Sequence, residues 1–159
     1  MKKDIKYLVM DVDGTLTDGK IYMGNEGELF KAFNIKDGCG IHDILIPSGI
    51  VPVIITGRKS KILENRCNEL KIDKLYQGVG DKLTVLKQIL EVDGFNFSNV
   101  AYIGDDINDL SCMQQVKEDS GIVGCPSDAV EKVKKIADYT CNAKGGEGAV
   151  REFIEWLLY

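Results

Sequence analysis

The chain has 159 residues, of which 44% are hydrophobic and 28% charged, and its formal net charge at pH 7 is -5. These proportions are typical of a globular protein, and the length suits one domain, residues 1–159, with a full hydrophobic core. An acidic chain without a basic face is unsuited to nucleic acid, so no such partner is expected.

The sequence also gives no indication of a membrane span, a signal peptide, a disulfide framework or a zinc site. No apolar stretch approaches the roughly 18 residues of a membrane span, and the N-terminal residues lead into a short apolar segment without the core of a signal peptide. The five cysteines are odd in number and scattered singly, without Cys-x-x-Cys spacing. This distribution argues against a disulfide framework and a zinc site. We therefore expect a cytoplasmic protein without a membrane segment.

A short apolar segment at residues 7–10 is followed at once by Asp11 and Asp13. Four consecutive apolar residues are typical of a strand buried on both faces of a parallel sheet. Because side chains alternate along an extended segment, both carboxylates should converge at the carboxyl edge of that sheet, with Gly14 allowing a tight turn. Like charges this close call for a hard cation such as Mg²⁺. The same residues also fit a polar turn, so the metal hypothesis depends on motifs downstream.

The segment at residues 20–33 has the pattern of a β-hairpin, with its turn at residues 24–27. Both of its strands are apolar. The apolar residues are Ile21, Tyr22, Met23, Leu29, Phe30 and Phe33. A protruding apolar ribbon either covers a site or packs against another subunit, because large exposed apolar patches are uncommon on monomers. We favour the subunit interface.

Beyond residue 34 the apolar spacing alternates between helix and strand patterns. The expected strands lie at 51–55, 74–76, 99–103, 121–123 and 138–140, and the expected helices contain residues 41–45, 62–70, 82–92, 110–117, 130–133 and 150–157. The single histidine, His42, falls on the polar side of the first helix, which favours a structural or solvated role. The alternation predicts an α/β fold with an open, doubly wound, mostly parallel sheet and helices on both faces.

Polar residues suited to phosphate chemistry lie at strand ends or just after them. They are Asp11 and Asp13, Thr56, Lys82, and Asp105 with Asp106 and Asp109. Lys82 lies in the first turn of its helix, where the helix dipole disfavours a cation unless an anion is near. At one edge of a parallel sheet these groups can share a pocket. Carboxylates, a lysine and a hydroxyl are the parts that hold Mg²⁺ and a phosphate, so the pattern predicts phosphoryl transfer.

A signalling receiver domain uses similar parts and is the main alternative from another class. A receiver carries its phosphorylated aspartate at the end of a middle strand, where this chain has Thr56. It would also lack the Gly-Asp-Asp cluster at residues 104–106. A non-catalytic protein with the same architecture would be expected to lack one of the acidic residues named above, and all of them are present. These features favour an enzyme.

The motifs resemble those of the haloacid dehalogenase-like phosphatases, which carry Asp-x-Asp-Gly-Thr-Leu, a Thr, a Lys and Gly-Asp-Asp-x-x-Asp in this order. Here they stand at residues 11–16, Thr56, Lys82 and residues 104–109. The resemblance implies a Mg²⁺-dependent phosphoric monoester hydrolase. Asp11 would be the nucleophile that forms an aspartyl-phosphate, and Asp13 would act as general acid and then as general base. The implied metal ligands are Asp11, the backbone carbonyl of Asp13, and Asp105, with Asp106 and Asp109 supporting them and with Thr56 and Lys82 on the phosphoryl oxygens.

The whole chain is similar to a capless subgroup of that family, the 3-deoxy-D-manno-octulosonate 8-phosphate phosphatases of lipopolysaccharide biosynthesis. Only about 40 residues separate the first motif from Thr56, which leaves no room for a cap domain. The similar segments are 17–19, 33–38, 55–60, 75–78, 101–106 and 145–152. The resemblance implies a homotetramer in which the hairpins form a central barrel and neighbouring subunits complete each active site.

The resemblance also implies a set of substrate contacts. By position they are Asp13, Asn34, Asp37, Gly38, Thr56, Gly57, Arg58, Arg66 and Lys82. His42 stands where some relatives carry Arg, and the chain ends at Tyr159 without the tail that several members extend toward a neighbouring site. Related phosphatases act on nine-carbon, sialic-acid-type substrates and can carry an acidic residue at position 58. A guanidinium suits the carboxylate of a sugar acid. Because Arg58 stands in place of that acidic residue, the resemblance favours the eight-carbon substrate, with the nine-carbon one or another small phosphorylated metabolite as the alternative.

Overall fold

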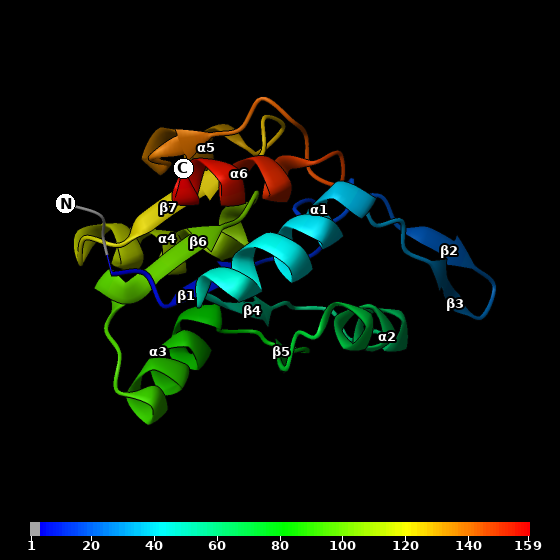
Figure 1. Ribbon diagram of the computed structural model, residues 1–159. Coiled ribbons are helices and arrows are strands. Elements are labelled where there is room, and N and C mark those ends of the chain that lie inside the picture. The colour runs from blue at the N-terminus through cyan, green and yellow to red at the C-terminus, as the bar shows by residue number, and fades with distance from the viewer. Residues whose placement is uncertain (1–3) are drawn as a thin grey trace.

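The apolar segment before Asp11 forms strand β1 (Tyr7–Met10), which lies in the middle of a parallel sheet. The computed structural model describes residues 4–159. The sheet has six strands in the order β5-β4-β1-β6-β7-β8, and every neighbouring pair is parallel (Figure 1). The other strands are β4 (Val51–Ile55), β5 (Lys74–Tyr76), β6 (Val100–Ile103), β7 (Ile122–Cys125) and β8 (Tyr139–Thr140). The predicted parallel α/β sheet is confirmed.

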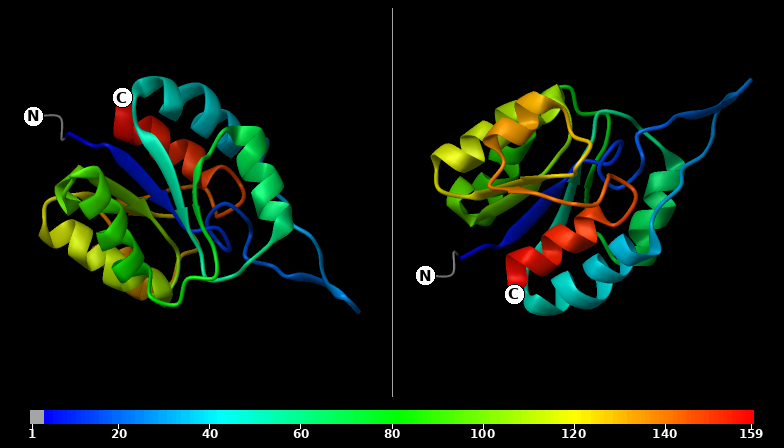
Figure 2. Two further views of the ribbon diagram at one scale, coloured as in Figure 1. Left: turned by 90° about the horizontal axis from the view of Figure 1, so that it is seen from below. Right: turned by 90° about the horizontal axis from the view of Figure 1, so that it is seen from above.

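Helices cover both faces of this sheet (Figure 2). They are α1 (Ile35–Cys39), α2 (Lys61–Leu70), α3 (Lys82–Asp93), α4 (Leu110–Glu118), α5 (Glu131–Ile136) and α6 (Ala149–Leu158). α1, α2 and α6 lie on one face, and α3, α4 and α5 lie on the other. Between β1 and β4 the chain forms only the hairpin and a helical segment, so no cap domain is inserted there.

β1 is buried on both faces, as its sequence predicts. Leu8 and Met10 belong to the core under α2 and α6, whereas Tyr7 and Val9 belong to the core under α3 and α4. All four are at most 3% exposed. Each such side chain contributes roughly 1.5–3 kcal/mol when buried. The aspartates that follow β1 therefore start from a firmly anchored strand.

The helical segment after the hairpin starts earlier than its apolar spacing indicates. Oδ1 of Asn34 accepts a hydrogen bond from the Lys36 amide at 2.8 Å and so caps α1 at Ile35. The segment continues as a π-helical stretch, Gly40–Leu45, and ends at Gly49, which has φ +89°. The predicted helix is confirmed, but its first residue is set by a cap that apolar periodicity does not reveal.

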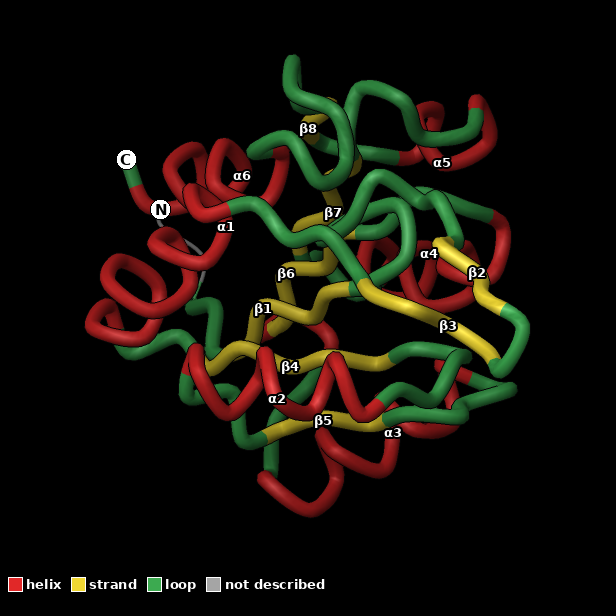
Figure 3. The backbone as a smooth tube through the Cα atoms, turned by 90° about the vertical axis from the view of Figure 1, so that its right-hand side faces the viewer, coloured by secondary structure: helices red, strands yellow, loops and turns green. Residues whose placement is uncertain are grey.

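The predicted hairpin is formed by β2 (Tyr22–Gly24) and β3 (Gly27–Phe30) and projects from the sheet (Figures 1 and 3). Several of its apolar side chains face solvent: Leu29 is 65% exposed, Met23 58% and Phe30 50%. The rings of Tyr22 and Phe30 stack with centroids 4.4 Å apart, which stiffens the ribbon. An exposed apolar ribbon of this kind is suited to packing against another protein surface.

Two further features complete the description. All five cysteines are free thiols; Cys39 is exposed and the other four are buried. Within residues 4–159, no helix has both the length and the apolar character needed to cross a membrane.

Candidate active site

A pocket of about 330 Å³ opens at the carboxyl edge of the sheet, where β1, β4 and β6 end. This volume lies in the range of small-molecule sites. The lining residues are Asp11, Asp13, Gly19, Thr56, Gly57, Arg58, Asp105, Asp106, Ile107 and Asn108. Residues that follow three different strands thus share one pocket, as the parallel topology predicts.

Asp11 and Asp13 enter the pocket from the end of β1. Asp11 is only 4% exposed, and its amide donates to the carbonyl of Ile103 in β6 at 3.2 Å. Gly14 has φ +90°, and a Cβ at this position would lie 2.0 Å from Oδ2 of Asp105. Any other residue at position 14 would strain the backbone and displace the Asp105 carboxylate. Gly14 therefore allows the two acidic loops to approach each other.

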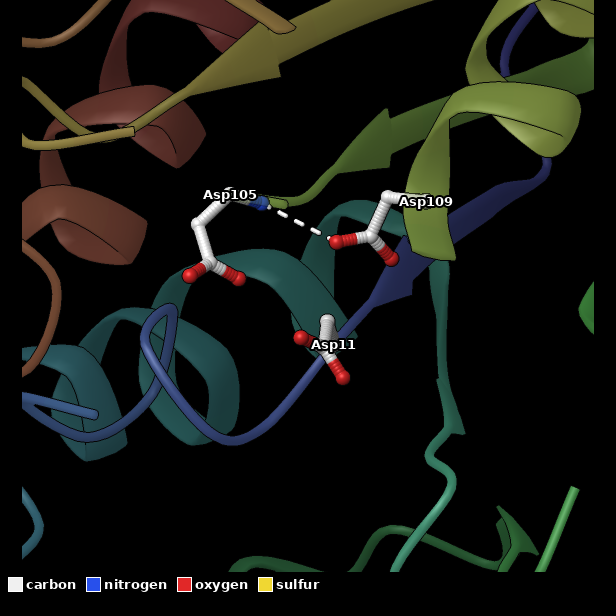
Figure 4. A group of neighbouring side chains, drawn as sticks. All are labelled: Asp11, Asp105 and Asp109. Carbon is white, nitrogen blue, oxygen red and sulfur yellow. Dashed lines mark hydrogen bonds between the residues drawn. The ribbon is translucent and has the colours of Figure 1, made fainter. Parts of the chain in front are cut away.

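The carboxylates of Asp11, Asp105 and Asp109 converge, with one oxygen of each lying within 4.8 Å of the others (Figure 4). Burial and the charge of Asp109 raise the pKa of Asp11 to about 6, against the opposing effect of Lys82. Burial and the charge of Asp11 raise the pKa of Asp105 to about 8. Both shifts show that negative charge is crowded at this point. A cation among these oxygens would relieve the repulsion.

Lys82, in the first turn of α3, is buried between two of these acids. Its Nζ lies 2.9 Å from Oδ1 of Asp11 and 3.0 Å from Oδ1 of Asp109, and the residue is 3% exposed. Burial opposes the charge of Lys82, but Asp109 and Asp11 outweigh it and raise the pKa of the lysine. The anion expected beside this first-turn lysine is therefore present, as a pair of carboxylates.

Asp109 is fully buried and fully engaged in hydrogen bonds. Its Oδ1 accepts from Lys82 and from the hydroxyl of Tyr102 at 2.7 Å, and its Oδ2 accepts from the amides of Asp105 at 3.0 Å and Asp106 at 3.3 Å. A carboxylate bound in this way orients its neighbours and has little capacity left for an ion. Asp11 and Asp105 remain as the carboxylates able to bind a metal. An all-oxygen, negatively charged donor set of this kind fits Mg²⁺.

The loop after β4 forms another wall of the pocket. Thr56 is 2% exposed; its amide donates to the carbonyl of Tyr76 at 3.0 Å, and its own carbonyl accepts from the amide of Val79 at 3.1 Å. Gly57 comes next, and then Arg58, whose side chain is 45% exposed. The loop therefore lines the pocket with a buried threonine on a hydrogen-bonded backbone and with an exposed arginine.

Five of the substrate contacts implied by the resemblance do not line this pocket. One is Lys82, which is buried with its Nζ on Asp11. Asn34, Asp37, Gly38 and Arg66 line a separate cavity of about 10 Å³, which has room for about one water molecule. The guanidinium of Arg66 lies 5.5 Å from the centre of the Phe33 ring and pairs with a neighbouring glutamate on α2. These residues therefore sit between α1 and α2, away from the acids at the strand ends.

Asp37 and His42 both lie outside the pocket that the strand-end acids line. Oδ1 of Asp37 accepts from the Arg151 amide at 2.9 Å, in the first turn of α6. Burial raises the pKa of this carboxyl to about 6, although amides at the start of α6 partly offset the effect. His42 pairs with Asp43 at 2.6 Å on the surface and does not line the pocket. Asp37 contacts residues more than 100 positions away, which no local pattern could indicate.

Two residues for which no role was predicted from the sequence, Lys31 and Tyr102, contact acidic residues of the site. Nζ of Lys31 lies 2.9 Å from Oδ1 of Asp13, and the hydroxyl of Tyr102 binds Asp109. The sequence does contain an indication for Tyr102, because a tyrosine in a buried apolar strand needs a hydrogen-bond partner for its hydroxyl. The sequence did not distinguish Lys31, because Lys20, Glu26 and Glu28 are also charged residues of the hairpin segment.

Comparison with known proteins agrees with this geometry. Residues 72–154 match the family described as haloacid dehalogenase-like hydrolase. The 3-deoxy-D-manno-octulosonate 8-phosphate phosphatase KdsC of Escherichia coli (strain K12) is 46% identical over 156 residues, which is 98% of this chain and 80% of that protein. The match thus extends over nearly the whole chain and is not limited to the motifs.

Solved structures of 3-deoxy-D-manno-octulosonate 8-phosphate phosphatases are similar to this chain over nearly its whole length. The structure of 3-deoxy-D-manno-octulosonate 8-phosphate phosphatase from Yersinia pestis has a TM-score of 0.91 and 46% identity, covering 99% of this chain and 82% of that one. That of the Moraxella catarrhalis enzyme, in complex with a magnesium ion, a phosphate ion and a KDO molecule, has a TM-score of 0.91 and 41% identity, covering 99% and 87%. The chain therefore belongs to the haloacid dehalogenase-like hydrolases, in the family of the 3-deoxy-D-manno-octulosonate 8-phosphate phosphatases.

Proposed function

We propose that this protein hydrolyses 3-deoxy-D-manno-octulosonate 8-phosphate to the free sugar acid and phosphate. The observation that carries the proposal is the convergence of Asp11, Lys82 and Asp105 at one sheet edge, in a chain 46% identical to KdsC over nearly its full length. A carboxylate held by a buried lysine beside a cation site has the parts needed for phosphoryl transfer.

The proposed reaction takes place in two steps at Asp11. Lys82 holds Oδ1 of Asp11, so the other carboxylate oxygen is free to attack phosphorus. As that oxygen–phosphorus bond forms, the ester P–O bond breaks, and Asp13 protonates the departing alkoxide. Asp13 then takes a proton from a water molecule, which attacks the aspartyl-phosphate and releases phosphate. Both carboxylates return to their starting states, so the cycle is balanced.

The metal and the phosphoryl group have separate proposed contacts. Asp11, Asp105 and the backbone carbonyl of Asp13 would hold Mg²⁺, with Asp106 and Asp109 in support. When bound, Mg²⁺ supplies positive charge that offsets both the crowded carboxylates and the transferring phosphoryl group. The proposed contacts to phosphoryl oxygens are Thr56, Gly57 and Lys82, and Arg58 would bind the carboxylate of the sugar acid.

A phosphate-release screen tests the proposed substrate. The protein with Mg²⁺ is assayed against eight-carbon and nine-carbon keto-sugar-acid phosphates and simple hexose phosphates. We expect the highest kcat/KM for the eight-carbon substrate, because nearly the whole chain is similar to a phosphatase of that substrate. Hexose phosphates should be poor substrates, because they lack the carboxylate with which Arg58 can pair. A nine-carbon substrate preferred by tenfold or more, about 1.4 kcal/mol, would instead assign the chain to sialic-acid-type phosphates. Failure to hydrolyse any of them would refute the proposal.

We also propose a homotetramer assembled through the β2–β3 hairpin, because several of its apolar side chains, among them Met23 and Leu29, face solvent. Leu29→Asp, at 65% exposure, would place like charges together in such an interface. In sedimentation at micromolar concentration, we expect the wild type to be tetrameric and Leu29→Asp to dissociate. Val92→Asp, at 85% exposure on α3, is the matched control and should leave the assembly intact. A fully active wild-type monomer would exclude the proposal.

A further inference from the structure

Lys31, which follows β3, is buried between two carboxylates at the base of the hairpin. Its Nζ lies 2.9 Å from Oδ1 of Asp13 and 3.0 Å from Oε2 of Glu28, and its side chain is 4% exposed. Lysine side chains are rarely buried to this degree unless they are paired. The contact with Asp13 spans 18 positions in the sequence, so it ties the hairpin to the loop after β1.

Glu28 holds Lys31 from the other side. Its side chain is 13% exposed, and Oε1 accepts a hydrogen bond from the hydroxyl of Ser60 at 3.2 Å. Oε2 lies 3.7 Å from Nη2 of Arg58. The Ser60 side chain makes no capping bond to α2, although it stands at the N-cap position. Lys31 is therefore restrained both by β3 and by the loop after β4.

Lys31 and Glu28 do not line the pocket, whereas Asp13 does. Lys31 contacts the pocket directly through Asp13, and it reaches Arg58 only by way of Glu28. Because Lys31 holds Oδ1, the second oxygen of Asp13 is left to exchange a proton with the substrate. We propose that Lys31, anchored by Glu28, is a positioning residue that fixes Asp13 for proton transfer to the leaving group. This inference rests on the phosphatase function proposed above.

Positioning of this kind matters because proton transfer is sensitive to geometry. The acid must lie within about 2.6–3.2 Å of the leaving oxygen, and a misplacement of about 1 Å can lower the rate about 100-fold. Asp13 sits in a loop with its side chain 22% exposed, so packing alone does not restrict its rotamer. As the ester bond breaks, the proton passes from Asp13 to the alkoxide oxygen, and Lys31 keeps its own protons throughout.

Leaving-group dependence tests the proposal. The substrates are the eight-carbon sugar acid phosphate, whose alkoxide must be protonated, and 4-nitrophenyl phosphate, whose phenolate leaves without a proton. For Lys31→Met we expect kcat/KM to fall about 100-fold for the sugar phosphate and less than about threefold for the aryl ester. Lys31→Arg, which keeps the charge and donors, should restore the sugar phosphate reaction to within about tenfold of wild type. Lys20→Met, at an exposed lysine, should change neither value.

Each other outcome has a distinct meaning. An equal loss for both substrates, or a rise in KM with unchanged kcat, would show that Lys31 does not act through Asp13 and would overturn the inference. If Lys31→Met does not fold, Glu28→Gln replaces it, and we expect a smaller loss of kcat, confined to the sugar phosphate and without a rise in KM; a rise in KM alone would report the contact of Glu28 with Arg58 instead. An unselective or absent effect in Glu28→Gln would equally overturn it. If the wild type hydrolyses neither substrate, the proposed function itself fails.

Discussion

Replacing Asp11 with Asn is expected to abolish steady-state phosphate release while leaving the fold intact. The amide is nearly isosteric with the carboxylate but is a poor nucleophile, so no aspartyl-phosphate can form. We expect a loss of at least about 10⁴-fold in kcat, as for the removal of other covalent nucleophiles. The fold should tolerate the change, because burial and Asp109 already disfavour the charged form of Asp11 and raise its pKa to about 6.

The Asp11→Asn experiment needs both a rate and a fold readout. Phosphate release gives the rate, and circular dichroism with a thermal midpoint gives the fold. Asp43→Asn is the matched control, because Asp43 is exposed, pairs only with His42 among the described salt bridges, and does not line the pocket. Its rate should stay within about twofold of wild type. Turnover by Asp11→Asn equal to that of the wild type would reject Asp11 as the nucleophile.

Replacing Lys82 with Met should cost both stability and activity. The substitution keeps most of the side-chain volume but leaves Asp11 and Asp109 buried without their shared cation; these residues are 4% and 0% exposed. Removal of one partner from a buried ion pair typically destabilises by about 3–5 kcal/mol. Turnover should be lost as well, because Lys82 orients the attacking carboxylate at 2.9 Å.

Urea unfolding without Mg²⁺ measures the stability change in Lys82→Met. Lys87→Met, at an exposed position on the same helix, is the control and should change stability by less than about 0.5 kcal/mol. The double variant Lys82→Met with Asp109→Asn removes one of the unpaired charges and should recover part of the loss. If Lys82→Met is no less stable than the Lys87 control, the buried charge network does not stabilise the fold.

The fold could largely be predicted because buried strands and helices have recognisable patterns of apolar residues in the sequence. Residues 7–10 are apolar without interruption, and each of them enters a core on one face of the sheet or the other. The pocket could be predicted for a related reason. Parallel strands end at the same edge, so Thr56 and Asp105 could be placed beside Asp11 without knowing the strand order. The strand order itself came only from the structure.

Other residues of the site depended on contacts between distant parts of the chain. Oδ1 of Asp37 accepts a hydrogen bond from the Arg151 amide of α6, 114 positions along the chain, and the role of Asp37 at the substrate stays a prediction. No role was predicted for Lys31 from the sequence, yet its Nζ lies 2.9 Å from Oδ1 of Asp13 in the folded protein. The start of α1 likewise depends on the Asn34 side chain, which caps the helix and is not part of the apolar pattern. In each case the direction of one side chain decides the role.

The sequence by itself determined that this protein is a parallel α/β fold with an acidic, phosphate-handling edge. Hydrophobic periodicity and the order of the motifs are sufficient for that conclusion, because both follow from local backbone geometry. The tertiary structure alone decided which charges meet: Lys82 lies between Asp11 and Asp109, and Lys31 between Asp13 and Glu28. Such pairings depend on how helices and loops pack against the sheet, and a charge in the sequence does not specify its partner in space.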